Sequence, residues 1–249
     1  MGLLDNTFKE VKRTDPGMMI IYAFPKVGKT EALLHLEGNL VLEFDPDGAE
    51  YYSGNYINVS SLSDLKALEM EFVEKKPHFK YITLDTLTTF YEDMVNALAV
   101  EEYNKTASIK SKLSPNADIN VLDFGKGHYY KRRILQKHLN FFKQYCDTLI
   151  MTGHVADASL SKDQSDVNYQ ELAIEGKLKE ILAVKIDAMG KMFRSSENTN
   201  SIDFNVSGSA SGSRSPHLDG KVIEVSKKNP DGTLTTYWDK IFKDGTVKK

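Results

Sequence analysis

One stretch constrains the fold of this chain more than any other: Ala23-Phe24-Pro25-Lys26-Val27-Gly28-Lys29-Thr30. It follows an apolar strand candidate, residues 18–22, and leads into a short helix candidate, residues 31–36. A glycine-containing turn between a strand and a helix is the setting of a phosphate-binding P-loop. Backbone N–H groups in such a turn form a concave anion site, and the start of the helix adds partial positive charge. The stretch therefore predicts a nucleotide-phosphate site; an ordinary turn before a helix is the alternative.

Individual roles follow from the positions within this turn. Lys29 is expected to reach the β- and γ-phosphates of ATP, and the Thr30 hydroxyl to hold Mg²⁺. Ala23 stands where the pattern has its first glycine, and it fits if φ stays negative there. Pro25 is expected to stiffen the loop by fixing its own φ. We expect the nucleotide to be bound by Pro25, Lys26, Val27, Gly28, Lys29, Thr30 and Glu31.

The composition is that of a globular protein. The chain has 249 residues, of which 41% are hydrophobic and 27% are charged, which leaves ample material for a core. A net charge of −3 predicts no general attraction to nucleic acid or anionic lipid, so any such binding must come from a local patch. The N-terminal residues have no signal-peptide pattern and no apolar run is long enough to cross a bilayer. We therefore expect a cytoplasmic protein with no membrane partner.

Strand and helix candidates alternate along most of the chain. Strands are expected at residues 39–44, 56–59, 80–85 and 148–152, and helices at residues 62–75, 88–103 and 128–146. This alternation predicts an α/β fold with a mostly parallel sheet flanked by helices. Residues 105–123 have weak periodicity and are expected to form a mobile surface loop.

The character of the sequence changes near residue 185. Residues 184–193, 202–206, 221–226 and 233–238 read as strands, with a linker-like Ser/Gly segment at residues 207–214. The region is too short and polar for a core of its own. We therefore expect an N-terminal segment (1–17), a core (18–184) and a β-rich C-terminal extension of the same domain (185–249).

Carboxylates are expected beside the phosphates. Asp85 ends an apolar strand about 55 residues after Lys29, as does the carboxylate that holds Mg²⁺ in P-loop NTPases; a helix cap is the alternative. Asp45, Asp47 and Glu50 follow the strand at 39–44, and ligands lie outside the carboxyl ends of parallel strands. One of them can orient the attacking water as general base, whereas a solvated acidic turn is the plainer interpretation.

His154 follows the strand at 148–152 and is expected to face the same crevice. There it can hydrogen-bond the γ-phosphate; a structural histidine is the alternative.

The order of these motifs resembles the core of RecA-type ATPases. The segments Pro25–Thr30, Leu84-Asp85-Thr86-Leu87, Gly153-His154 and Gly212-Ser213-Arg214 are similar to those of phage-encoded RecA-like ATPases. Those are small single-domain proteins of phage nucleotide binding, recombination and single-strand annealing. The resemblance spans residues 17–226.

The resemblance implies a RecA-like P-loop NTPase core that hydrolyses ATP with Mg²⁺ as a homo-oligomer, with ATP at the subunit interfaces. It gives Asp85 the Mg²⁺-side role and Asp47 the position of the catalytic glutamate. His154 takes the position of a γ-phosphate sensor. Arg214 resembles an arginine that completes a neighbouring subunit's site; an ordinary surface arginine in a Ser/Gly loop is the alternative.

A local basic patch points to a nucleic-acid partner. Residues 124–146 contain no Asp or Glu, and Tyr129 and Tyr130 stand among the basic residues Lys126, Lys131, Arg132, Arg133 and Lys137. Cations with stacking aromatics are typical of single-stranded DNA sites, while the solvated face of a core helix is the alternative. The segment 158–175 is acidic, which argues against a simple two-loop DNA channel.

The sequence thus favours a Mg²⁺-dependent ATPase that acts on single-stranded DNA in phage recombination, annealing or repair, in the bacterial host cytoplasm. A single-stranded-DNA-binding protein is a further expected partner. A small-metabolite kinase is one alternative, although residues 105–123 offer no arginine for a lid. A nucleotide-gated clamp or loader without fast turnover is the other.

Overall fold

The computed structural model describes residues 13–45, 48–159, 168–174, 178–205 and 212–243. The strands and helices, in chain order, are β1 (Met18–Ala23), α1 (Lys29–Leu34), β2 (Asn39–Glu43), β3 (Tyr56–Asn58), α2 (Leu62–Lys75), β4 (Phe79–Asp85), α3 (Leu87–Thr89), a π-helical turn (Phe90–Val95), α4 (Asn96–Thr106), α5 (Lys126–Lys143), β5 (Cys146–Ser159), β6 (Asn168–Leu172), α6 (Leu178–Lys185), β7 (Ala188–Ser196), β8 (Thr199–Asp203), β9 (Gly212–Ser213), β10 (Val222–Lys228) and β11 (Leu234–Thr236).

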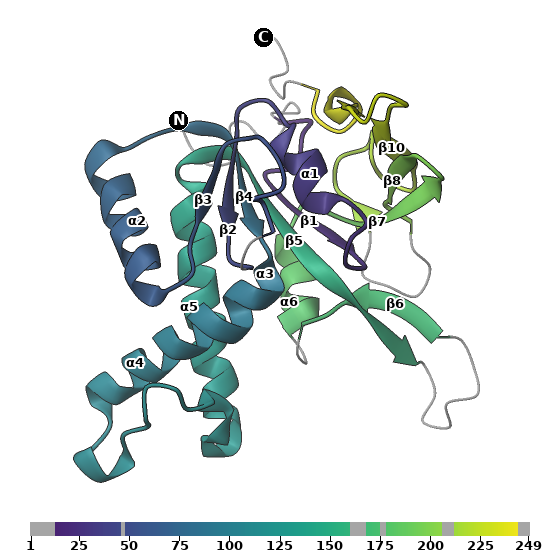
Figure 1. Ribbon diagram of the computed structural model, residues 1–249. Helices are drawn as coiled ribbons and strands as arrows, with labels where there is room; N and C mark the ends of the chain where they lie inside the picture. Colours follow the sequence, from purple (N-terminus) through teal and green to yellow (C-terminus); the bar gives the residue numbers. More distant parts are fainter. Residues whose placement is uncertain (1–12, 46–47, 160–167, 175–177, 206–211, 244–249) are drawn as a thin grey trace, which may run out of the picture.

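A central sheet organises the molecule (Figure 1), with the strand order β11-β10-β8-β7-β1-β5-β4-β2-β3. The strands from β3 to β7 in this order are parallel, and β8, β10 and β11 add on in antiparallel fashion. The α/β prediction is confirmed: the sheet is mostly parallel, is flanked by helices and carries additional C-terminal strands. Because β1, β5, β4 and β2 are parallel neighbours, their carboxyl ends meet at one edge.

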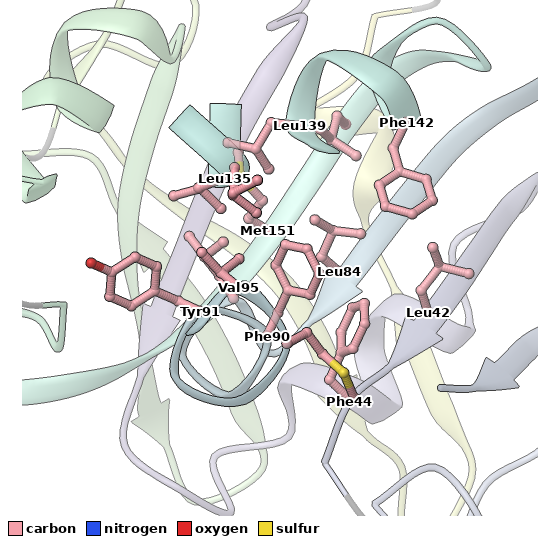
Figure 2. Close-up of a cluster of buried hydrophobic side chains, with 14 of the residues drawn as sticks. Leu42, Phe44, Leu84, Phe90, Tyr91, Val95, Leu135, Leu139, Phe142 and Met151 are labelled. Atoms are coloured by element: carbon pink, nitrogen blue, oxygen red, sulfur yellow. The ribbon is translucent and has the colours of Figure 1, made fainter. Parts of the chain in front are cut away.

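Both faces of the sheet are covered, as the alternation of side chains along β1 shows. Ile20 and Tyr22 point into a core built with α2, α4, α5 and α6. Met19 and Ile21 point to the other face, which packs against α1 and the C-terminal region. Figure 2 shows part of the first core, where Phe90 and Val95 of the π-helical turn meet Leu84 of β4 and side chains of α5. These contacts hold the strand end that carries Asp85.

Three segments differ from expectation. β5 continues beyond residue 152 and pairs with β6, so a hairpin projects from the sheet where a loop was expected (Figure 1). Residue 184 lies in α6 rather than in a strand, because Leu178 and Leu182 bury one helix face. Residues 105–123 are anchored: the Asn96 side chain donates to the Ala117 carbonyl at 2.9 Å and accepts from the Ile119 N–H at 3.1 Å.

The C-terminal strands continue the sheet of the core. β7 pairs directly with β1, and the indole Nε1 of Trp238 donates to the Ala32 carbonyl of α1 at 2.8 Å. The boundary at residue 185 therefore lies within one continuous sheet, and the three-part division stays a prediction. None of the described helices is long and apolar enough to span a membrane.

Candidate nucleotide site

The turn after β1 has the backbone that an anion site needs. Gly28 has φ +106°, a left-handed conformation that favours glycine. A Cβ on Gly28 would also lie 3.2 Å from Nδ2 of Asn200, so strand β8, which lies beyond β7 in the sheet, packs closely against the turn. Because α1 is only six residues long, the backbone N–H groups and Lys29 supply most of the positive potential here.

Lys29 is held inside this turn. Its side chain is buried, and Nζ lies 3.4 Å from the carbonyl oxygens of Ala23 and Phe24, which are long hydrogen bonds. Burial lowers the pKa of Lys29, while the charges of Asp85 and Asp45 oppose that shift. A buried ammonium with weak partners is well suited to bind a polyphosphate.

Thr30 and Asp85 come together although they are far apart in sequence. The Thr30 hydroxyl donates to Asp85 Oδ2 at 2.6 Å, and the Thr152 hydroxyl donates to Oδ1. Burial raises the pKa of Asp85, against the lowering effect of both hydrogen bonds and of Lys29. A hydroxyl and a carboxylate are oxygen donors of the kind that Mg²⁺ prefers, so this pair fits the cation that the P-loop implies.

Two further carboxylates lie at this edge. Glu43 is the parallel-ladder neighbour of Asp85 and is 1% exposed. Its Oε1 accepts from the Ala49 N–H, while Oε2 is buried and has no hydrogen-bond partner in the described structure. Burial raises the pKa of Glu43, and the negative charges of Asp85 and Asp45 raise it further. The hydrogen bond from the Ala49 N–H lowers the pKa and offsets part of this shift. Asp45 accepts a hydrogen bond from the Thr89 hydroxyl.

The sequence analysis missed Glu43, Thr152 and Thr89 as members of this group. Glu43 ends an apolar strand, as Asp85 does, and that signal was available in the sequence. Asp47, the expected catalytic carboxylate, lies outside the described residues.

His154 lies beside the P-loop strand. It pairs in register with Ala23, the last residue of β1, and its backbone N–H lies 3.4 Å from the Thr88 hydroxyl. Its Nδ1 is buried without a hydrogen-bond partner among the described residues. The structure therefore brings His154 to the expected edge of the sheet.

Arg214 lies elsewhere. Its guanidinium donates to the Val184 carbonyl and pairs with Asp187 at 3.4 Å. Asp187 directly precedes β7, whose first residue pairs with Met19 near the start of β1. Arg214 is thus at the end of the sheet opposite to the P-loop of its own chain.

The basic patch on α5 needs one correction. Lys131 is buried, lies 3.8 Å from Asp118 and stacks over the Tyr91 ring at 5.2 Å, so its ammonium is not displayed on the surface. Lys126, Arg133 and Lys137 are exposed, and Arg132 is half-buried. Lys137 acts on the charge of Glu69, and Arg133 and Lys137 both act on the charge of Glu102.

A groove runs along this part of α5. It has a volume of about 570 Å³ and an apolar floor that includes Leu139 of α5 and Leu182 of α6. Its polar lining includes Tyr129, Arg132, Arg133 and Lys185, and no carboxylate stands among its described lining residues.

A second cavity of about 580 Å³ opens at the P-loop. Residues 26–31 form one wall, Gly48 and Tyr52 lie beside it, and β7, β8, β10 and β11 supply the wall opposite.

An anion cradle with a buried lysine, beside a threonine–carboxylate pair at the carboxyl ends of parallel strands, defines a P-loop nucleotide-binding protein. The family described as an AAA domain matches residues 15–223 of the 249. The protein belongs to this family.

No curated protein matches the chain. The solved crystal structure of the RadB recombinase aligns over 90% of this chain and 92% of that chain, at 12% sequence identity and a TM-score of 0.46.

Proposed function

We propose that this protein is a Mg²⁺-dependent ATPase that acts on single-stranded DNA. The observation that carries the ATPase part is the Thr30–Asp85 hydrogen bond beside the buried Lys29. In the proposed complex the backbone of the turn and Lys29 bind the phosphates, and Thr30 and Asp85 hold Mg²⁺. The cation would stabilise the charge that develops as the γ-phosphoryl group leaves.

A carboxylate is needed to orient the attacking water and accept its proton. We assign this role to Asp45, because its charge acts on both Lys29 and Asp85 and its side chain is fixed by Thr89. Asp47 stays a second candidate for this role. His154 is proposed to sense the γ-phosphate through Nδ1, which has no hydrogen-bond partner among the residues that the structure describes.

The groove along α5 supports the DNA part. Arg132, Arg133 and Lys185 offer positive charge, and Tyr129, which is 54% exposed, offers a ring for base stacking. Single strands are held by this combination without sequence preference. The proposed setting is recombination, annealing or repair of phage DNA in a host cytoplasm, with a single-stranded-DNA-binding protein as a further partner.

A homo-oligomer is part of the same proposal. Arg214 is too far along the sheet to serve its own P-loop, but its guanidinium is largely exposed and is held by the ion pair with Asp187 at 3.4 Å and by the hydrogen bond to the Val184 carbonyl. On assembly, Arg214 would leave Asp187 and contact the phosphates of the nucleotide that a neighbouring subunit binds. Arg214 would therefore act only in the oligomer.

The test is the rate of ATP hydrolysis with and without an oligothymidylate, at about 50 mM and about 200 mM salt. We expect stimulation by DNA that weakens at the higher salt, because phosphate contacts release counterions.

Lys29→Ala is expected to abolish ATP binding. Arg133→Ala is expected to raise the DNA concentration needed for half-maximal stimulation, whereas Lys75→Ala on α2 leaves it unchanged.

Each part of the proposal can fail separately. A rate of ATP hydrolysis that DNA does not change at either salt concentration rejects the DNA part of the proposal and leaves an ATPase. ATP binding without hydrolysis favours the clamp or loader. Wild-type turnover by Lys29→Ala rejects the P-loop assignment itself.

A further inference from the structure

The wall of the nucleotide cavity that faces the P-loop comes from the C-terminal strands of the same chain. Its described lining residues on that side are Arg194, Glu197, Asn198, Asn200, Lys228 and Leu234. None of these positions belongs to the P-loop motif or to the carboxylate group described above. They lie on β7, β8, β10 and β11 and in the turn between β7 and β8, and they approach the site because these strands extend the sheet beyond β1.

The contact between this wall and the P-loop is close. Nδ2 of Asn200 lies 3.2 Å from the position that a Cβ on Gly28 would take. The same nitrogen donates to the hydroxyl of Ser226, which is fully buried, at 3.3 Å. Its Oδ1 is buried and has no hydrogen-bond partner in the described structure. The wall is thus seated against the phosphate-binding turn without help from a second subunit.

The strand register determines which side chains face the cavity. Asn200 of β8 pairs with Arg194 of β7 on one side and with Ser226 of β10 on the other. Directly paired residues project from the same face, and Lys228 follows Ser226 by two positions and shares that face. Both pairings have a bulge at this level, a feature that re-aims side chains and is common near active sites.

The charges in the cavity favour a polyphosphate. Lys26, Lys29, Arg194 and Lys228 are cationic, against the two carboxylates of Glu31 and Glu197. The side chains of Arg194 and Lys228 are exposed, so they are free to reorient toward a ligand.

We propose that Arg194 and Lys228 contact the phosphates of the bound nucleotide in cis and thereby contribute to its affinity in a single subunit. This inference rests on the proposed function, because it deepens the same nucleotide site. Arg194 is assigned the larger share, since its guanidinium can bind phosphate oxygens in bidentate fashion, whereas Lys228 acts as a point charge.

The test is a binding titration of monomeric protein with ATP, ADP and GTP, each with Mg²⁺. Arg194→Ala is expected to weaken ATP and GTP binding by about tenfold each, and Lys228→Ala by about threefold. Lys227→Ala is the matched control, because it is exposed, adjacent on β10 and absent from the cavity lining. All three substitutions are at exposed positions, and equal melting temperatures will verify that the variants fold.

The outcomes separate this inference from the proposed function. Wild-type protein that binds no nucleotide would reject the proposed function. Wild-type protein that binds ATP, with unchanged affinity in Arg194→Ala and Lys228→Ala, rejects the inference alone. A loss confined to one nucleobase rejects the phosphate contact, and a loss seen only in assembled protein rejects action in cis.

Discussion

At the scale of single residues, Glu43 has surroundings that are unfavourable for a charge. Its carboxyl is buried beside Asp85 and Asp45, and burial raises its pKa above the usual 4.5. In the pH interval between the unfolded and folded pKa values, the folded state therefore holds a proton that the unfolded state has lost. Stability falls as pH rises through that interval.

Glu43→Gln removes this titration while keeping the shape and the acceptor for the Ala49 N–H. We expect the nucleotide-free variant to melt about 2–4 °C higher at neutral pH and to depend less on pH above the usual carboxyl pKa of 4.5. Thermal melts across that range check it. The exposed Glu37→Gln is the control, and a Glu43→Gln melting profile that parallels the wild type would contradict the prediction.

The sequence predicted the meeting of Thr30 with Asp85 because motif spacing and strand order suffice for it, and the two lie 2.6 Å apart. Their roles stay predictions. Burial is what residue types do not reveal: Lys131 was placed on a DNA-binding face, but α5 turns it toward Tyr91 and Asp118. Glu43 was overlooked although it ends an apolar strand, as Asp85 does.

At the scale of elements, the start of α5 depends on a close approach of two backbones. Gly127 is buried, and a Cβ there would lie 2.3 Å from the Ile119 carbonyl oxygen and 2.7 Å from Cα of Asn120. Gly127→Ala must therefore displace either α5 or the preceding segment. We expect a loss of about 1–3 kcal/mol in the free energy of unfolding, measured by urea denaturation.

His128→Ala is the matched control for this prediction, because His128 is the next residue of α5 and its side chain is exposed. Equal free energies of unfolding for the two variants would contradict the prediction, because they would show that α5 and the segment that contains Ile119 can move apart without a loss of stability.

The same elements show where periodicity was sufficient and where it was not. α2 has the bounds that its pattern predicted, residues 62–75, because its buried leucines recur at helical spacing. The segment 105–123 has no such periodic pattern. It is ordered instead by hydrogen bonds from the side chains of Asn96 and Asn104 and by the buried Ile119. Such anchors connect positions nine or more residues apart and leave no periodic signal.

At the scale of the whole molecule, the sheet does not end where the sequence changes character. β7 covers the edge of β1, and Met192, Ile202 and Phe204 pack in the same core as residues of β1 and α1. The C-terminal strands also form a wall of the nucleotide cavity. The sequence predicted this extension of the sheet, but not its approach to the P-loop, which depends on the register of β8 and β10.

A chain that ends at Lys185 is therefore expected not to fold. It would expose the edge of β1 and remove most of the apolar cover from one face of the sheet, including Trp238, whose indole is hydrogen-bonded to α1. We expect non-cooperative thermal unfolding and no ATP binding. A chain that ends at residue 243 is the control and should melt as the wild type does. Cooperative unfolding of the shorter chain would mean that the core up to residue 185 is a domain by itself, and that the C-terminal strands only add to a site that is already formed.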